Sequence, residues 1–295
     1  MGPIPGNKLP GYDHSVPPGQ SLFPYVIWFS LMRRLSVWKT LVWAFEIMKA
    51  RIKATLFVII LTTLGWSAGW ADQLAQTMAN PSRSSDSGPP QKPYYLTGNE
   101  DVWRNFPPKP ALGSPVDEAD LLITLSLQAS RTEEQKNEAL RDKSYDIKLM
   151  TGVINPDFEN VYKDVFDVLK NADIDSYYIN TMIKDENGRL RPFVQHPTLV
   201  IPLFTSADFS YPSGHASGME LQARILAELF PDKSDALLQR ARQIADSRVV
   251  AGVHYASDTE AGLALGDLLF SELKSKSAFE KDLTKAAEKD KTPGR

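Results

Sequence analysis

The sequence predicts an all-α domain that begins near Val116, and three observations carry this prediction. Apolar residues recur at helical spacing in DEADLLITLSLQA, FENVYKDVFDVLKN, GMELQARILAELF and DALLQRARQIADSRVVA. Polar residues stand where helix caps are expected. Only TLVIPLF, at Thr198–Phe204, resembles a strand, and it is short. We therefore expect a single helical domain over residues 116–275.

Capping patterns mark three expected helix starts. Thr132 with Gln135, and Ser257 with Glu260, have the spacing of a capping box, in which two side chains satisfy the free N–H groups of a helix start. Ser234 is placed to cap a helix that begins at the next residue. Residues 276–295 are highly charged, and we expect them to form a solvated helix that frays into a tail.

The chain before this domain divides by composition into three segments. Residues 1–47 are rich in proline and aromatic residues, and we interpret them as a non-native or poorly structured extension, with Met48 as the natural start. Residues 48–71 combine a basic stretch with an apolar run, which is typical of a signal peptide cut after Ala71. Residues 72–115 are Pro/Ser-rich and predict a linker or an arm that wraps the domain.

The apolar run at 54–71 permits two interpretations. A cleaved signal peptide implies a periplasmic protein, and the small and polar residues in the second half of the run favour it. The alternative is an uncleaved segment that anchors the protein in a membrane, because the run approaches the roughly 20 residues that span a bilayer. No later stretch is long and apolar enough for a span, so we expect no stable membrane insertion after cleavage.

Composition excludes several classes of site. The chain has no cysteine, so disulfides, thiolate catalysis and thiolate metal sites are excluded. Its four histidines are too few for a His-rich metal cluster, and we expect neither a metal nor a cofactor. The net charge of -3 gives no global footprint for a nucleic-acid partner, so any anion site must be local.

Three short segments contain residues suited to phosphate chemistry. Their pattern is K-x6-R-P, P-S-G-H and S-R-x5-H-x3-D, and its members are Lys184, Arg191, Pro192, Pro212, Ser213, Gly214, His215, Ser247, Arg248, His254 and Asp258. A phosphoryl group in transfer spreads its charge over several oxygens, so a catalyst needs fixed donors around it. Lys184, Arg191 and Arg248 supply cationic donors for this role.

Ser213 and Gly214 precede an amphipathic run and are therefore expected at a helix N-terminus, where free N–H groups attract anions. Gly214 would also let the backbone approach a phosphate closely. Ser217 with Glu220 offers a competing capping box, which would start the regular helix one turn later.

The three-part pattern resembles that of the type 2 phosphatidic acid phosphatase superfamily, which includes bacterial non-specific acid phosphatases and vanadium haloperoxidases. The lead-in to the domain and the QASRTEEQ stretch look like the class A acid phosphatases. Phe209 and Ala216 depart from that class, which usually shows G-S-Y-P-S-G-H-T. The resemblance implies a helical bundle of the phosphatase and haloperoxidase type, small-molecule phosphomonoester substrates and a homo-oligomer.

The resemblance also implies a role for each catalytic residue. His254 is the nucleophile that takes the phosphoryl group, and Asp258 orients its ring. His215 is the general acid that protonates the leaving oxygen and then the base that activates water. Because His215 must first carry a proton, this division predicts an acidic optimum. Arg189 fits no position of the pattern, and we interpret it as a solvated neighbour.

Three alternatives remain open. A vanadate-dependent haloperoxidase would use the same donors, because vanadate resembles the phosphoryl transition state. A lipid-phosphate phosphatase shares the pattern but places it among several membrane spans, which are missing after residue 72. A catalytically dead phosphate-binding module would have lost a histidine or the aspartate, and none is lost.

Overall fold

The computed structural model describes residues 92–98 and 101–294, and within them the protein is helical with no strand. The all-α prediction is therefore confirmed for these residues. The expected extension at 1–47 and signal peptide at 48–71 lie outside them, as does the start of the arm. No helix in the described part of the chain is both long and apolar enough to cross a membrane.

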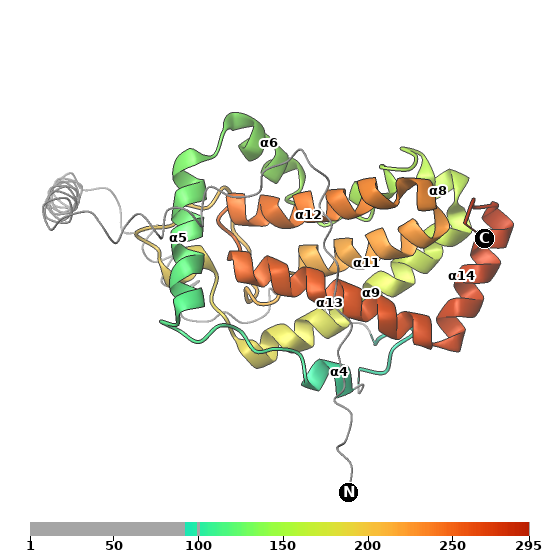
Figure 1. Ribbon diagram of the computed structural model, residues 1–295, viewed down its shortest axis with the longest axis horizontal. Coiled ribbons are helices and arrows are strands. Elements are labelled where there is room, and N and C mark those ends of the chain that lie inside the picture. The colour runs from blue at the N-terminus through green and yellow to red at the C-terminus, as the bar shows by residue number, and fades with distance from the viewer. Residues whose placement is uncertain (1–91, 99–100, 295) are drawn as a thin grey trace, which may run out of the picture. The chain divides into compact units, whose positions relative to one another are not determined.

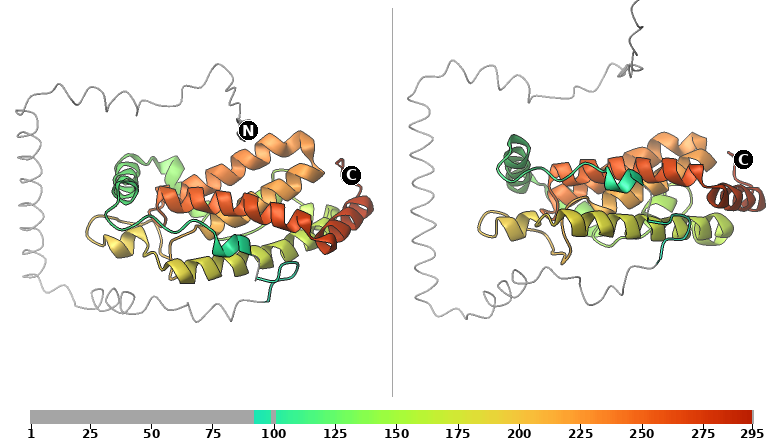
Figure 2. Two further views of the ribbon diagram at one scale, coloured as in Figure 1. Left: turned by 60° about the horizontal axis from the view of Figure 1, so that its bottom comes forward. Right: turned by 90° about the horizontal axis from the view of Figure 1, so that it is seen from below.

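The helices are α4 (Asp101–Arg104), α5 (Pro115–Ser130), α6 (Glu133–Arg141), α7 (Lys148–Thr151), α8 (Phe158–Val161), α9 (Lys163–Asn187), α10 (Pro192–Gln195), α11 (Gly214–Leu229), η2 (Pro231–Lys233), α12 (Ser234–Val250), α13 (Ala256–Ser275) and α14 (Ser277–Asp290). The long helices α9, α11, α12 and α13 run side by side as a bundle (Figures 1 and 2). Helix α5 crosses one end of this bundle, and α14 packs at the other end (Figure 1).

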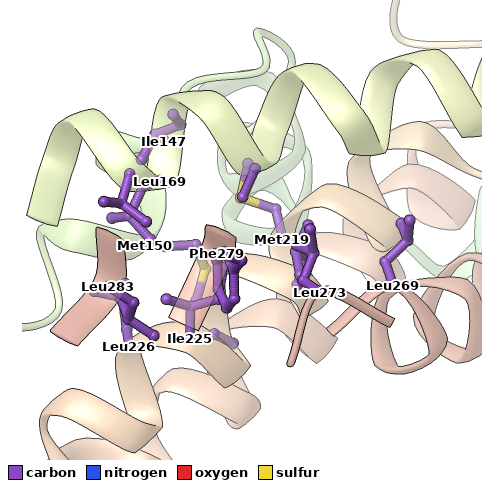
Figure 3. Packing of buried hydrophobic residues seen from close by; sticks show 14 of the residues in the cluster. Ile147, Met150, Leu169, Met219, Ile225, Leu226, Leu269, Leu273, Phe279 and Leu283 are labelled. Atoms are coloured by element: carbon purple, nitrogen blue, oxygen red, sulfur yellow. The ribbon is translucent and has the colours of Figure 1, made fainter. Parts of the chain in front are cut away.

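The hydrophobic core centres on α11. Met219, Ile225 and Leu226 of α11 are fully buried and pack with side chains of α9, α13 and α14, among them Leu169 and Phe279 (Figure 3). Burying an aliphatic side chain of this size stabilises a fold by about 1.5–3 kcal/mol. The core therefore fixes the direction of α11, whose N-terminus carries part of the predicted site.

Two glycines bring α13 unusually close to α11. A Cβ atom at Gly262 would lie 2.6 Å from the carbonyl oxygen of Ser213, and one at Gly266 would lie 2.6 Å from that of Ser217. The N–H of Ser213 also donates to the carbonyl of Asp258 at 2.9 Å. The first turns of these two helices, which carry predicted site residues, are thereby held against each other.

Only one of the three expected caps is confirmed. Thr132 and Gln135 form a reciprocal capping box at the start of α6. The prediction for Ser234 is wrong, because α12 begins at Ser234 itself, directly after η2, without a side-chain cap. The prediction for Ser257 is also wrong, because α13 begins at Ala256 and the N–H of Ser257 donates to Asp120 of α5 at 2.9 Å.

The strand-like segment at residues 198–204 forms a loop. Its backbone is tied to the turn after α12 by the hydrogen bond from the N–H of Leu203 to the carbonyl of Ala251, at 2.9 Å. Val200 is buried, whereas Ile201 is exposed. A strand needs a partner strand for its backbone hydrogen bonds, and the described part of the chain contains none. The apolar residues of this segment pack as part of a loop instead.

The described part of the arm packs onto the bundle. Tyr95 and Trp103 are buried in the main core, whereas Tyr94 is exposed. The N–H groups of Tyr94 and Tyr95 donate to the buried carboxylate of Asp175 in α9, at 2.6 and 3.0 Å. A buried carboxylate needs such donors, so this contact fixes the arm along α9.

The helix expected within residues 276–295 is present as α14, but the prediction that it is solvated is wrong. Helix α14 packs on α9, and Phe279, Leu283 and Ala287 are fully buried. These residues follow one another at intervals of four, so they form one apolar stripe on the helix. The prediction rested on the high charge of the whole segment, and the charged residues lie between these apolar positions.

Candidate active site

The structure brings all eight predicted site residues to one end of the bundle, the end that α5 crosses. They lie near the end of α9, before α10, at the start of α11, at the end of α12 and around the start of α13, and they are Lys184, Arg191, Ser213, Gly214, His215, Arg248, His254 and Asp258. Helix ends are suited to a site of this kind, because their side chains and free backbone groups can face a ligand while the bundle holds them.

His254 lies in the turn between α12 and α13 and is almost fully buried. Its Nε2 atom is 3.1 Å from Nη1 of Arg191, and its Nδ1 atom is 3.5 Å from Oδ2 of Asp258. A guanidinium group can only donate, so Nε2 must be the acceptor and the ring proton must reside on Nδ1. The lone pair of Nε2 is thereby directed toward the cationic side of the site.

His254 is neutral over the ordinary pH range. Burial and the charge of Arg191 lower its pKa to about 3, although Asp258 acts in the opposite direction. A neutral imidazole is the form that can act as a nucleophile, because protonation would occupy the lone pair of Nε2.

Asp258 is fully buried in the first turn of α13. Its Oδ1 atom accepts from Arg189 at 2.7 Å, and its Oδ2 atom accepts from the N–H of Tyr255 at 2.9 Å and from the hydroxyl of Ser210. Burial raises the pKa of Asp258, but the hydrogen bond to His254 and the charge of Arg189 outweigh it and lower the pKa to about 2. Asp258 is therefore a carboxylate that faces the proton-bearing nitrogen of His254.

The three predicted cations are buried, with 5% of Lys184, 4% of Arg191 and 3% of Arg248 exposed. Arg248 lies over the ring of Phe204 and donates from Nη1 to the carbonyl of Asp142 at 3.1 Å. Its Nε atom is buried and has no hydrogen-bond partner in the described part of the chain. Burial and the charge of Arg191 lower the pKa of Arg248 to about 9. These buried positive charges favour an anionic ligand.

Sequence reasoning missed Asp208, a carboxylate that binds two of these cations. Its Oδ2 is 2.7 Å from Nζ of Lys184, and its Oδ1 accepts from Nη2 of Arg191. Burial would raise the pKa of Asp208, but the charges of Lys184 and Arg191 lower it far below its usual range. The only signal in the sequence is the position of Asp208 shortly before the P-S-G-H segment, which does not predict an ion pair.

Ser213 and Gly214 lie at the N-terminus of α11, as the sequence predicted, and Ser213 is the residue that caps the helix. Its side chain accepts from the N–H of Ala216 at 3.4 Å, and the helix begins at Gly214. The competing start at Ser217 is wrong, because the Ser217 hydroxyl lies within the helix and donates to the carbonyl of Gly214 at 3.2 Å. A Cβ atom at Gly214 would lie 3.3 Å from Oδ1 of Asn180, so Gly214 also permits the close approach of α9.

His215 follows in the first turn of α11, and its Nε2 atom is buried without a hydrogen-bond partner in the described part of the chain. Burial, together with the charges of Arg248, His254 and Arg191, lowers the pKa of His215 well below its usual value. An unpaired ring nitrogen beside cations can exchange a proton with a bound anionic ligand.

An aromatic ring that the sequence did not indicate supports His215. The ring of Tyr145 packs edge-on against the imidazole, with the two ring centres 5.4 Å apart, and its hydroxyl donates to Asp173 of α9. Tyr145 lies in the loop between α6 and α7, far from the motif segments, which is why the pattern could not reveal it.

The interpretation of Arg189 as a solvated neighbour is wrong. Arg189 is 5% exposed and donates to Asp117, Asp120 and Asp258, as well as to the hydroxyl of Ser257. The sequence could not reveal this role, because all four partners lie 68 to 72 positions away from Arg189.

Comparison with known proteins points to the segment that contains these residues. The model of the PAP2 superfamily matches residues 174–274, which include every predicted site residue. The chain is 34% identical over 130 residues to the non-specific acid phosphatase of Salmonella typhimurium, an alignment that covers 42% of this chain and 52% of that protein. It is 27% identical over 208 residues to the non-specific acid phosphatase of Providencia stuartii, covering 65% and 83%.

The chain thus spans about half the length of the Salmonella relative. Among solved structures, a bacterial vanadium-dependent iodoperoxidase has a TM-score of 0.49 at 20% identity, covering 68% of this chain and 64% of that one. The span that the family model matches contains all three parts of the pattern, at Lys184–Arg191, Ser213–His215 and Arg248–Asp258. Residues 174–274 thus match the PAP2 superfamily, and the chain is similar to bacterial non-specific acid phosphatases.

Proposed function

We propose that this protein is an acid phosphatase that hydrolyses phosphomonoesters through a phosphohistidine intermediate on His254. The observation that carries the proposal is the state of His254: a neutral imidazole has Asp258 at Nδ1 and directs its Nε2 lone pair toward the buried cations. The relatives named non-specific acid phosphatases support the same activity.

In the first step, Nε2 of His254 attacks phosphorus. The new P–N bond forms as the P–O bond to the leaving group breaks, and His215 donates its proton to the departing oxygen. The imidazole becomes positively charged, and the carboxylate of Asp258 stabilises it through the proton on Nδ1.

In the second step, a water molecule attacks the phosphorus of the phosphohistidine. His215, now neutral, takes a proton from this water, and the P–N bond breaks to return the electron pair to Nε2 of His254. Inorganic phosphate leaves, and both histidines regain their starting states.

Binding of the phosphoryl group is assigned to Lys184, Arg191, Arg248 and the backbone N–H groups around Ser213 and Gly214. The free Nε of Arg248 and the start of α11 are donors suited to phosphate oxygens. Because these groups supply positive charge, we predict that hydrolysis requires no metal.

The wider setting of the enzyme is also a proposal. The apolar run at 54–71 supports export to the periplasm, with an uncleaved anchor as the alternative. The substrates would be small phosphomonoesters, because the site residues recognise the phosphate and specify no leaving group. Similarity to the acid phosphatases favours a homo-oligomer.

The first experiment measures hydrolysis of p-nitrophenyl phosphate by the full chain from pH 4 to 8 in the presence of EDTA. We expect activity that is highest in acid, survives EDTA and is lost in His254→Ala but not in His196→Ala, a matched change outside the cluster. Mass spectrometry after alkaline quenching should find the phosphoryl group on His254. A wild type without hydrolysis would contradict the proposal, and bromide oxidation with vanadate and peroxide would then test the haloperoxidase alternative.

A further inference from the structure

Arg189 joins α5 to the catalytic carboxylate. Its Nη1 atom donates to Oδ1 of Asp258 and to the hydroxyl of Ser257, both at 2.7 Å, and its Nη2 atom donates to Asp117 at 3.0 Å and Asp120 at 2.9 Å. The guanidinium also lies over the ring of Tyr255, 4.1 Å from its centre. Four hydrogen bonds and a stacked ring leave this side chain a single orientation.

The contact with Arg189 gives the two carboxylate oxygens of Asp258 different partners. Oδ1 is bound to Arg189, so Oδ2 is left to face Nδ1 of His254. The carbonyl of Arg189 also accepts from the N–H of Ser210 at 2.7 Å, and the hydroxyl of Ser210 lies 3.4 Å from the same Nδ1. Arg189 therefore holds both groups that border the proton-bearing side of the nucleophile.

The carboxylates on α5 balance the charge of Arg189. A lone guanidinium beside Asp258 would weaken its attraction for the positive charge that develops on His254. Asp120 is 3% exposed, and with Asp117 it places two further negative charges on the opposite side of the guanidinium. Arg189 can thus orient Asp258 without cancelling its negative charge.

We propose that Arg189 is a positioning residue, anchored by Asp117 and Asp120 of α5, that sets the orientation of Asp258 and through it that of His254. The inference rests on the proposed phosphatase reaction. Helix α5 lies before the segment that the family model matches, at residues 174–274, so the anchor comes from outside the motif region.

A double-mutant cycle tests this assignment, with kcat and KM measured on p-nitrophenyl phosphate. Arg189→Gln should lower kcat by about 10- to 100-fold, the range seen for partners that orient a functional side chain, with a much smaller change in KM. In an Asp258→Ala background the same change should lower kcat by less than about 2-fold, because the group that Arg189 positions is absent.

Two further variants separate positioning from general stability. Arg189→Lys should retain more activity than Arg189→Gln, because lysine keeps the charge but gives only a point contact. Arg242→Gln is the matched control, since Arg242 pairs with Glu260, two residues after Asp258 in α13, but is solvent-exposed. We expect its kcat to equal that of wild type.

The outcomes are distinguishable. An equal loss of kcat from Arg189→Gln in both backgrounds, or no loss in the wild-type background, would overturn the inference while leaving the proposed function intact. A wild type without hydrolysis would overturn both. If Arg189→Gln shows no cooperative unfolding transition, the cycle is run with Arg189→Lys, and the same two results decide it.

Discussion

The ammonium group of Lys184 lies 2.7 Å from the carboxylate of Asp208, so a side chain of the protein itself already binds a cation assigned to the substrate. Asp208 also accepts from Arg191. Because its pKa is far below the usual range, Asp208 stays ionised at any working pH and competes with a phosphate for both cations. The side chain of Asp208 is 51% exposed, so it can swing toward solvent when an anion arrives.

We therefore predict that Asp208→Asn strengthens inhibition by inorganic phosphate. Removing the competing charge should lower the inhibition constant by about 3- to 10-fold, which corresponds to roughly 0.7–1.4 kcal/mol. Steady-state inhibition at fixed pH measures this constant, and Asp232→Asn, an exposed site on η2, is the control. An unchanged or raised inhibition constant would show that Asp208 organises the cations rather than competing for them.

The pH dependence of activity should follow His215. Burial and the charges of Arg248, His254 and Arg191 lower the pKa of His215. Its protonated form is therefore present only at pH values below the usual histidine range. We expect kcat/KM to fall as pH rises, with a midpoint below about 6.5, and to show no such decline in His215→Asn. A midpoint above that value in wild type would be inconsistent with this environment of His215.

The pH dependence of stability should follow His254. The unfolded chain binds a proton at the usual histidine pKa of about 6.5, whereas the folded protein does so only near pH 3. The unfolded state therefore holds more protons between these values, and acidification through this window lowers the free energy of unfolding.

Asp258 adds a loss at still lower pH, because its stabilising contribution is present above the unfolded pKa and disappears as pH falls through about 2. Urea titrations of wild type and His254→Asn at several pH values measure the effect of His254. We predict a flatter dependence on pH in the variant between about pH 6 and 4. Equal slopes would show that His254 does not carry this linkage.

Gly262 should tolerate no side chain. The carbonyl of Ser213 lies 2.6 Å from where a Cβ atom would stand, and this contact joins α13 to the start of α11. Gly262→Ala should lower the free energy of unfolding by about 1–3 kcal/mol and reduce kcat, because it separates Asp258 from the Ser213 segment. Chemical denaturation and kinetics check this, with Ala264→Ser at an exposed position of the same helix as the control. Wild-type stability in Gly262→Ala would contradict the close approach.

The fold class followed from local patterns because the apolar spacing of α5, α9, α11 and α12 is visible within each segment. Helix starts were harder to predict. Ser257 has the spacing of a cap, yet Asp120 from α5 takes its N–H and the helix begins one residue before it. The stripe of Phe279, Leu283 and Ala287 was present in the sequence but was outweighed by the charge around it.

The sequence by itself determined the helical class and singled out the eight residues that the structure brings together, because their identities and spacings are local properties of three short segments. Only the tertiary structure decided which groups surround them. Arg189 meets Asp258 across 69 positions of sequence and Asp117 across 72, and Tyr145 reaches His215 from a separate loop. Such pairs form only when helix ends from distant parts of the chain pack together. The sequence alone therefore does not distinguish an arginine in a buried ion pair from a solvated one.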